Sequence, residues 1–260
     1  MSPSAYYKWK SGSSSQRFQE NKHIASLIEK IHIDSPDKGY RRIHDDLKRF
    51  HNVHSNDKRI LRICRSLGIQ STVKFHPAGC TRHARTPQHY SENILNREFH
   101  AEKPNEKWLT DVTEFKYYEG PRVKKVYLSA ILDLYDRRIV AFAIRDTNDN
   151  KLVFDTFAKA VQRNPDAHPI FHSDRGFQYT NRYFYQRLVN AGMTQSMSRV
   201  GRCIDNGPME GFWGILKRER YYGKRFTNRT ELVKMIRSYI HYYNTKRLQR
   251  NLGVLTPMEK

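Results

Sequence analysis

Three carboxylates stand out among the 26 acidic residues of this 260-residue chain. Asp111 interrupts one apolar run, Asp174 follows another, and Glu210 opens a helix-like stretch rich in aromatic and small residues. A carboxylate within an apolar segment costs free energy unless a cation meets it. Three that converged would form a site for hard divalent cations, which prefer oxygen ligands. Two such ions about 3.5–4 Å apart can activate a nucleophile and stabilise a leaving oxygen, so these residues predict phosphoryl transfer.

The motifs around these acids resemble those of a family of bacterial transposases. Asp111 ends a Trp-Leu-Thr-Asp motif, Asp174 lies in His-Ser-Asp-Arg-Gly, and Glu210 lies in Asp-Asn-Gly-Pro-Met-Glu-Gly-Phe-Trp-Gly. Thirty-five residues separate Asp174 from Glu210, and Lys217 follows the glutamate by seven. With a Tyr-Asn-Thr-Lys-Arg motif at 243–247, this order resembles the OrfB-type insertion-sequence transposases. These are encoded by the second of two overlapping reading frames, and their catalytic domain is related to retroviral integrase.

The resemblance implies a DDE catalytic site and a mechanism for it. Asp111, Asp174 and Glu210 would hold two Mg²⁺ ions, for which Mn²⁺ can substitute, with Asp111 bridging both. Water would first cut at the transposon end, and the freed 3′-OH would then attack a second phosphodiester. Lys217 would contact the phosphate beside the cut, because it lies two turns after Glu210 on one helix face. Gly214 between them is expected to leave room for a DNA backbone, since a mid-helix glycine costs roughly 1 kcal/mol.

The sequence gives less support for a role of the other charged residues near these motifs. Arg175 and Arg202 are predicted to contact DNA, although the sequence does not fix the direction of either side chain. Asp133 and Asp136 flank a predicted strand turn, where each can be solvated. Asp205 is expected to shape the loop before the helix that carries the glutamate.

The charge of the chain predicts a polyanionic partner. Its 47 Lys and Arg residues outnumber the 26 acidic residues, for a formal net charge of +21. Nucleic acid is the first candidate, although ribosomal and membrane-surface proteins share such an excess. Because the cations are spread among core-forming segments and form no long basic tail, they predict folded DNA-binding surfaces. The resemblance specifies that DNA as the terminal inverted repeats of an insertion sequence and its target.

The sequence also bounds the compartment of the protein. No stretch approaches the roughly 20 apolar residues of a membrane span, and the N-terminus lacks an apolar signal-peptide core, so we expect a cytoplasmic, nucleoid-associated protein. The three cysteines are too scattered for a disulfide framework and predict free thiols: Cys64, Cys80 and Cys203. A zinc site is the alternative where His76, Cys80, His83 and His89 crowd a short segment. That segment has no Cys-x-x-Cys pair and is more typical of a linker.

Turn-forming residues and changes of hydrophobic period divide the chain into segments. The predicted segments are an N-terminal connector (1–20), a helix-turn-helix-like DNA-binding module (21–75), a linker (76–103), a DDE integrase catalytic core (104–222) and a C-terminal helical segment (223–260).

Apolar residues at helical spacing predict about three helices in the 21–75 module. Ser55 or Asn56 can cap the third helix, and Gly68 can end it. The last two helices resemble a helix-turn-helix, and Gly-Tyr-Arg-Arg-Ile-His at 39–44 matches a motif of OrfB-type transposases. One exposed side of the third helix would carry three cations able to meet phosphates or bases: Arg59, Arg62 and Arg65. A solvated basic face on a packing helix is the alternative.

After the linker the pattern changes to strands, in the order β-β-β-α-β-α-β-α. The predicted strands cover residues 108–117, 123–135, 139–144, 170–172 and 193–197. This order is that of the ribonuclease H-like fold, an α/β (α+β) arrangement with a five-stranded mixed sheet and flanking helices, which the resemblance also implies. Asp111 would lie on the first strand, Asp174 after the fourth and Glu210 on the last helix. Asn228 with Glu231 three residues on predicts the start of a C-terminal helix.

Two other functions stay open at this point. A ribonuclease H-like metal-dependent nuclease would share the fold and the three acids but would hydrolyse DNA without strand transfer; the helical module and the C-terminal motif argue against it. An inactive DNA-binding repressor derived from a transposase would keep the module, and the intact triad argues against that.

The sequence does not reveal the oligomeric state, the terminal repeat or the target preference. The resemblance implies a homo-oligomer on DNA. In this family a fused upstream segment often supplies end recognition and multimerisation. Fusion or association with an upstream-frame product is therefore part of the expectation.

Overall fold

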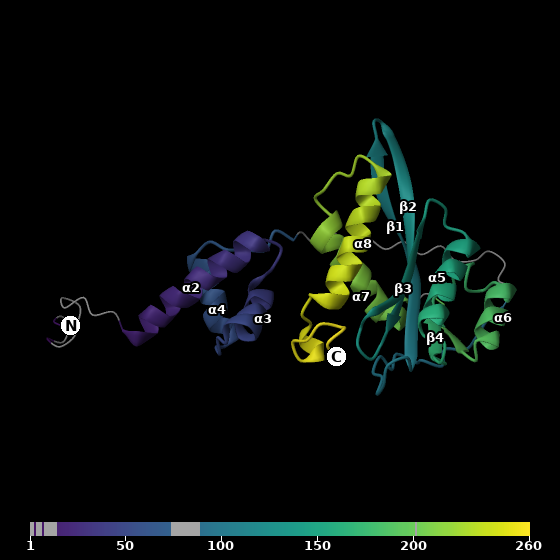
Figure 1. Cartoon of the computed structure of the whole chain (residues 1–260), viewed down its shortest axis with the longest axis horizontal. Coiled ribbons are helices and arrows are strands. Elements are labelled where there is room, and N and C mark those ends of the chain that lie inside the picture. Colours follow the sequence, from purple (N-terminus) through teal and green to yellow (C-terminus); the bar gives the residue numbers. More distant parts are fainter. Residues whose placement is uncertain (1–2, 4–6, 8–14, 74–88, 201) are drawn as a thin grey trace. The chain divides into compact units, whose positions relative to one another are not determined.

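The computed structural model describes residues 15–73, 89–200 and 202–260, together with residues 3 and 7 (Figure 1). The chain forms two compact units, Met1–Val73 and Lys74–Lys260. Among the described residues, no helix has both the length and the apolar character that crossing a bilayer requires.

Within residues 15–73, the first unit forms three helices around its own apolar core, as predicted. Its helices are α2 (Gln16–Asp34), α3 (Tyr40–His51) and α4 (Asp57–Ser66). The buried core residues come from all three helices: Ile24, Ile28, Ile43, Leu47, Ile60, Ile63 and Cys64. Helix α2 begins at Gln16, inside the segment predicted as a connector, because the Ser15 hydroxyl accepts the N–H of Phe18 at 3.2 Å and caps it.

Polar contacts at the ends of the helices fix the turn between α3 and α4. The side chain of Asn56 accepts the N–H of Arg59 at 2.8 Å, which confirms the predicted cap, and Gly68 takes a positive φ of 67° just after α4. His44, from the motif at 39–44, bonds Asp57 at 2.7 Å and the carbonyl of Ser55 at 2.9 Å. This histidine therefore joins α3 to the start of α4.

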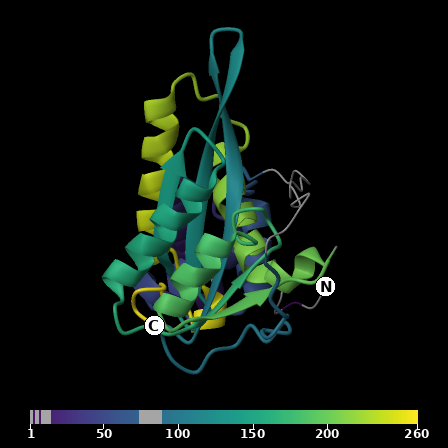
Figure 2. The ribbon, with the colours of Figure 1, turned by 90° about the vertical axis from the view of Figure 1, so that its right-hand side faces the viewer.

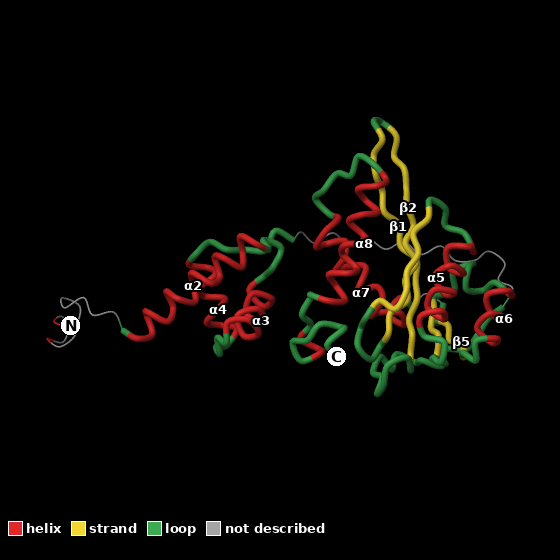
Figure 3. Tube along the Cα trace, viewed as in Figure 1, coloured by secondary structure: helices red, strands yellow, loops and turns green. Residues whose placement is uncertain are grey.

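The second unit is built on the five-stranded mixed sheet that the sequence predicts (Figure 3). The strands are β1 (Lys107–Glu119), β2 (Arg122–Asp133), β3 (Ile139–Arg145), β4 (Ile170–Ser173) and β5 (Thr194–Met197). They lie in the order β3-β2-β1-β4-β5. The first three pair antiparallel, whereas β4 pairs parallel with β1 and with β5. This topology is ribonuclease H-like and confirms the predicted α/β fold.

Helices cover both faces of the sheet (Figures 1 and 2). On one face lie α5 (Asn150–Arg163) and α6 (Arg182–Asn190), and on the other α7 (Gly207–Leu216) and α8 (Arg229–Thr245). Short helical turns flank them: η1 (Cys203–Asn206), the π-helical turn η2 (Lys217–Tyr221) and η3 (Arg250–Leu252). Alternate residues of β1 enter the two cores, because neighbouring side chains of a strand point to opposite faces. Trp108 packs with α5 and α6, while Leu109, Phe115 and Tyr117 pack with α7 and α8.

The β1–β2 hairpin extends well beyond the rest of the sheet (Figure 2). Strand β1 has 13 residues, whereas β4 has 4 and pairs with β1 only as far as Leu109. Past that point, the edge of β1 is partly closed by other groups. The Tyr221 hydroxyl accepts the N–H of Lys116 at 2.8 Å, and the carbonyl of Phe226 accepts the N–H of Tyr118 at 2.9 Å.

Two acids at the β2–β3 turn are buried rather than solvated, which corrects the prediction. Asp133 is fully buried and accepts the N–H groups of Asn105 at 2.7 Å and Tyr135 at 2.9 Å. Asp136 is also buried and accepts the N–H of Arg138 at 2.9 Å. Burial raises the pKa of Asp136 to about 6. Both carboxylates hold the turn together through backbone N–H groups.

Candidate active site

Asp111 lies on β1, just past the end of the β1–β4 pairing. Its Oδ1 accepts the backbone N–H of Val112 at 2.7 Å, and its Oδ2 accepts the indole N–H of Trp213 at 3.0 Å. Burial raises the pKa of the Asp111 carboxyl, and the nearby charges of Asp174 and Glu210 raise it further. The sheet therefore holds this acid in a position where its negative charge is disfavoured unless a cation compensates it.

Asp174 lies in the tight turn that follows β4. Its Oδ1 accepts the N–H of Gly176 at 2.8 Å. A Cβ atom at position 176 would stand 3.0 Å from this oxygen and 3.2 Å from Oε1 of Gln178, so a larger residue would crowd the turn. The glycine of the Asp-Arg-Gly motif is therefore explained by the local structure, because it lets the backbone fold back onto the carboxylate.

Glu210 lies in the first turn of α7, which begins with Gly207 and Pro208. Proline is favoured at the start of a helix because it has no N–H to lose. Burial raises the pKa of the Glu210 carboxyl, and the charge of Asp174 raises it too. Three acids from three separate elements therefore share one electrostatic region.

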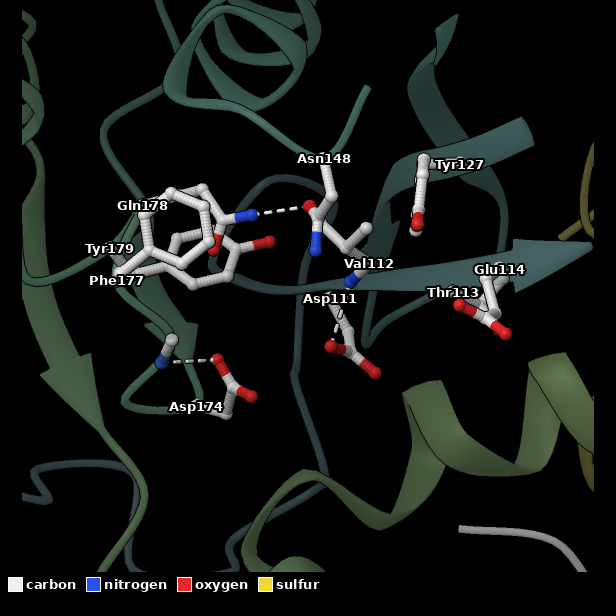
Figure 4. A pocket seen from close by; sticks show the side chains of 11 residues that line it. Asp111, Val112, Thr113, Glu114, Tyr127, Asn148, Asp174, Phe177, Gln178 and Tyr179 are labelled. Atoms are coloured by element: carbon white, nitrogen blue, oxygen red, sulfur yellow. Dashed lines mark hydrogen bonds between the residues drawn. The ribbon is translucent and has the colours of Figure 1, made fainter. Parts of the chain in front are cut away.

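The pocket beside Asp111 and Asp174 contains further polar side chains (Figure 4). Gln178 donates a hydrogen bond to Asn148 across its wall. Tyr127 of β2 and Glu114 of β1 extend the lining toward the hairpin. No spacing or motif in the sequence points to three of these lining residues: Asn148, Gln178 and Tyr127.

The three acids have the donor atoms that divalent cations prefer, but their side chains do not form one close cluster. All their side-chain donors are oxygens, the ligands that Mg²⁺ prefers, and their mutual repulsion is the kind that a cation removes. Across residues 15–73, 89–200 and 202–260, however, no three His, Cys, Asp or Glu side chains stand close enough to one another to hold one ion.

Trp213 has a function that the sequence analysis missed. Its ring is buried in the core on the α7–α8 side. Its indole N–H also binds Asp111. A buried tryptophan usually finds a partner for this group, which is the one signal that could have suggested the contact.

Lys217 begins the π-helical turn directly after α7. Its ammonium group lies 5.2 Å from the centre of the Phe115 ring on β1. The space beside Gly214 is occupied by the guanidinium of Arg218, which would stand 2.9 Å from a Cβ atom there. The gap predicted at Gly214 for a DNA backbone is therefore filled by the chain itself.

The two arginines predicted near the site differ in their surroundings. Arg175 donates to the carbonyl of Ser198 at 2.8 Å and lies over the ring of Tyr90, with 5.0 Å between guanidinium and ring centre. Arg202 is exposed. The first is thus held by the protein, whereas the second faces solvent, and the DNA contact of both stays a prediction.

Asp205 anchors the loop that leads into α7. Its fully buried carboxylate accepts hydrogen bonds from Arg97 at 2.6 Å, Arg199 at 2.9 Å and Asn93 at 3.0 Å. The hydrogen bond from Arg199 is the main cause that holds the pKa of Asp205 far below its usual range. This carboxylate therefore fastens two chain segments just before the helix of Glu210.

The three arginines predicted on α4 also differ. Arg62 and Arg65 are exposed, whereas Arg59 donates to Glu20 and to Asn21, both at 2.9 Å. Arg59 thus links α4 to α2 inside the module. Contact with DNA remains a prediction for all three.

The zinc alternative falls mostly on residues 76–83, which lie outside the described residues. His89 is described, and its ring stacks on Tyr185 with 3.8 Å between ring centres. Of the cysteines, Cys64 is a buried free thiol, as predicted. Cys80 and the side chain of Cys203 lie outside the described part of the chain.

A ribonuclease H-like sheet that follows a small helical unit in the chain, with acids on β1, after β4 and on α7, defines a class of integrase-like proteins. Models of the integrase core domain match residues 101–203 and 210–259, and a model of an HTH-like domain matches residues 19–75. The chain belongs to the insertion-sequence transposases that carry an integrase core domain.

Named relatives cover most of the chain. It is 42% identical over 210 residues to an uncharacterized transposase-like protein of Haemophilus influenzae, covering 79% of this chain and 93% of the relative. It is 35% identical over 255 residues to the putative transposase InsK of element IS150 from Escherichia coli, covering 98% and 87%. Among solved structures, the HTLV-2 integrase catalytic core domain in complex with magnesium is similar at 18% identity and a TM-score of 0.46, covering 60% of this chain and 95% of that one.

Proposed function

We propose that the chain is a DDE transposase that cleaves DNA at the ends of an insertion sequence and joins the freed 3′-OH to target DNA. The observation that carries this proposal is that Asp111 and Asp174 line one pocket of an integrase core domain, with Glu210 of α7 near enough for its charge to raise the pKa of Asp111. Phosphoryl transfer needs mainly positioning and charge neutralisation from a protein, and these acids supply both when cations join them.

The donor set fits two Mg²⁺ ions, which Asp111, Asp174 and Glu210 would hold; Mn²⁺ has the same preference for oxygen. Bound there, the ions would supply an activated water and neutralise charge on the scissile phosphate. The protein's own part is to hold the carboxylates. Trp213 and the Val112 N–H fix Asp111, and the Gly176 N–H fixes Asp174.

The DNA contacts we assign follow from cations that are exposed or that lie next to the site acids in the chain or on the same helical segment. Lys217, Arg175 and Arg202 would meet phosphates near the cut, and Arg62 and Arg65 would meet DNA from the helical module. In this assignment residues 21–75 bind DNA, residues 76–103 connect, and residues 104–222 perform the chemistry. Residues 223–260 brace that core through α8, whose Tyr239, together with Arg247 just beyond it, binds Glu219.

The test is strand transfer of a labelled element-end duplex with Mg²⁺ by the wild-type chain, Asp111→Asn and the exposed-acid control Asp166→Asn. We expect transfer by the wild type and the control and none by Asp111→Asn, with DNA binding unchanged in all three. Near wild-type transfer by Asp111→Asn would refute the site. Cleavage without joining would favour the ribonuclease H-like nuclease, and binding without either reaction would favour the repressor.

We extend the proposal to assembly, because transfer needs both element ends at once. The active form would be a homo-oligomer on DNA in the cytoplasm, with or without an upstream-frame product. The molar mass of the chain on end DNA, measured with and without that product, tests this. A single chain on one end that still performs joining would contradict it.

A further inference from the structure

The outward face of the β1–β2 hairpin continues the wall of the active-site pocket. Cross-strand partners in an antiparallel pair point to the same face, so the residues of this face can be read from the register. The hairpin face, as we name it, consists of the pairs Glu114–Tyr127, Lys116–Lys125 and Tyr118–Val123. Glu114 and Tyr127 line the pocket that also contains Asp111, and the other two pairs follow toward the hairpin tip. The Asp111 side chain itself points to the other face of β1, where Trp213 binds it, so the pocket reaches both faces at this strand. None of these six side chains is buried.

Two lysines stand directly opposite each other on this face. Like charges in that position destabilise a hairpin unless an anion lies between or above them. Lys125 bonds Glu114 at 3.0 Å, whereas the Lys116 ammonium forms no hydrogen bond or ion pair within residues 89–200 or 202–260. The Lys116 ammonium, next to the active-site pocket, is therefore suited to bind an anion from outside the protein.

Aromatic and cationic groups continue the face beyond the lysine pair. The guanidinium of Arg225 lies over the Tyr118 ring, 5.0 Å from its centre, and Arg225 is exposed. Val123 beside it is 55% exposed. Positive groups interleaved with aromatic rings are the surface on which nucleic-acid backbones and bases rest. The opposite face of the same hairpin differs, because Tyr117 and Val126 are buried there against the α7–α8 side.

Resting on the proposed function, we propose that the hairpin face binds the DNA next to the cut, with Lys116 and Lys125 on its phosphates. A strand rises about 3.3 Å per residue, so Lys116, five residues after Asp111, lies roughly 17 Å along the strand. At about 3.4 Å per nucleotide, this reach equals about five base pairs from the scissile phosphate. The occupant is DNA because the face joins the pocket for the scissile phosphate and the chain carries a net charge of +21.

The test compares Lys116→Gln with Lys124→Gln, the same change on the opposite face of the same hairpin. The full chain is mixed with end duplexes that extend either about 3 or about 12 base pairs past the cut. The first is shorter and the second longer than the roughly five base pairs between the scissile phosphate and Lys116. Binding is measured without metal, so the result does not depend on cleavage or joining. Lys116→Gln should weaken binding of the long duplex about three- to tenfold and reduce its salt slope by about one. Lys124→Gln should leave both unchanged, and Lys116→Arg should restore binding.

Three outcomes would overturn the assignment: no loss with Lys116→Gln, an equal loss with Lys124→Gln, or no gain in wild-type affinity from the longer duplex. The thermal midpoint of Lys116→Gln separates misfolding from lost contact. Removing one of two opposed lysines should leave that midpoint unchanged or raise it. Failure of joining by a wild-type chain that binds the long duplex would count against the proposed function alone.

Discussion

The indole of Trp213 both packs in the core and binds the central carboxylate, so its replacement by Phe separates these two effects. Trp213→Phe keeps a smaller aromatic ring in the core but removes the N–H that reaches Asp111 at 3.0 Å. A hydrogen bond to a charged group contributes about 1.5–3 kcal/mol. We expect single-turnover cleavage to slow about tenfold, since each 1.4 kcal/mol is a factor of ten, and the metal requirement to rise.

Trp108→Phe is the matched control for this change. Trp108 is fully buried on β1, the strand that carries Asp111. Its indole N–H lies 3.4 Å from Asp133, which is not one of the three candidate site acids. It should lower thermal stability without changing the cleavage rate at saturating metal. If both variants slow cleavage equally, Trp213 acts through packing and does not position Asp111.

Lys217 offers a second test at single-residue level. If its ammonium holds the phosphate beside the cut, Lys217→Ala removes one charge-assisted contact of about 1.5–3 kcal/mol. Part of this contact should act in the transition state, lowering the single-turnover rate about 10- to 100-fold. Lys234→Ala, an exposed lysine on α8, is the control. Loss of metal binding in a titration would mean that Lys217 orients Glu210. An unchanged cleavage rate would mean that Lys217 does not contact the DNA at all.

The loop before α7 depends on one buried acid, and this gives a pH test at the level of elements. Hydrogen bonds from Arg199 lower the pKa of Asp205, with Arg97 adding to the effect. Because the folded chain binds this proton less tightly, the unfolded chain takes it up first as pH falls. Asp205 therefore stabilises the fold fully above about pH 4, and this contribution is lost as pH falls toward the folded-state pKa.

Asp205→Asn should lower the free energy of unfolding at pH 7 by about 1.5–3 kcal/mol, because it removes a buried, charged acceptor to which the exposed Arg97 and Arg199 donate hydrogen bonds. The difference from wild type should shrink below about pH 4. Urea unfolding from pH 7 down to the lowest pH that keeps the wild type folded measures it, with Asp166→Asn as control. A difference that stays constant with pH would mean that shape, rather than charge, makes Asp205 important.

The strands and caps were predictable because they follow from local chemistry. Alternating and continuous apolar runs placed all five strands, with every strand limit within two residues of the prediction. Asn228 caps α8 as predicted by accepting the N–H of Glu231 at 2.7 Å. Helix α2 began earlier than predicted because Ser15 looked like part of a flexible serine-rich stretch.

What could not be predicted depends on contacts between distant segments. The Trp213–Asp111 bond joins residues about a hundred positions apart, and the sequence pattern of α7 shows only that Trp213 is apolar. Asp133 looked solvated because one of the two N–H groups that satisfy it comes from Asn105, 28 residues earlier in the chain. Arg218 fills the space at Gly214 through a side-chain rotamer, which no motif encodes.

The whole chain carries enough positive charge to make its DNA binding mainly electrostatic. With a net charge of +21, the affinity for an end duplex should fall with salt by a log–log slope of about −0.9 per phosphate neutralised. Six to ten such contacts would lower affinity about 10³- to 10⁵-fold between 50 and 200 mM salt. Affinity that does not change with salt would contradict electrostatic binding by the folded surfaces.

The helical module should contribute its own share to that slope. Arg62→Ala and Arg65→Ala, both on the exposed side of α4, should each reduce the slope by about one while leaving the metal-dependent rate at saturating DNA unchanged. Arg59→Ala should differ from them, because its ion pair with Glu20 joins α4 to α2, and its loss should lower the thermal stability of the module. Full-chain binding curves at several salt concentrations, beside a melting curve for each variant, distinguish these effects. If neither Arg62→Ala nor Arg65→Ala changes affinity, α4 presents a solvated basic face and the DNA is bound elsewhere.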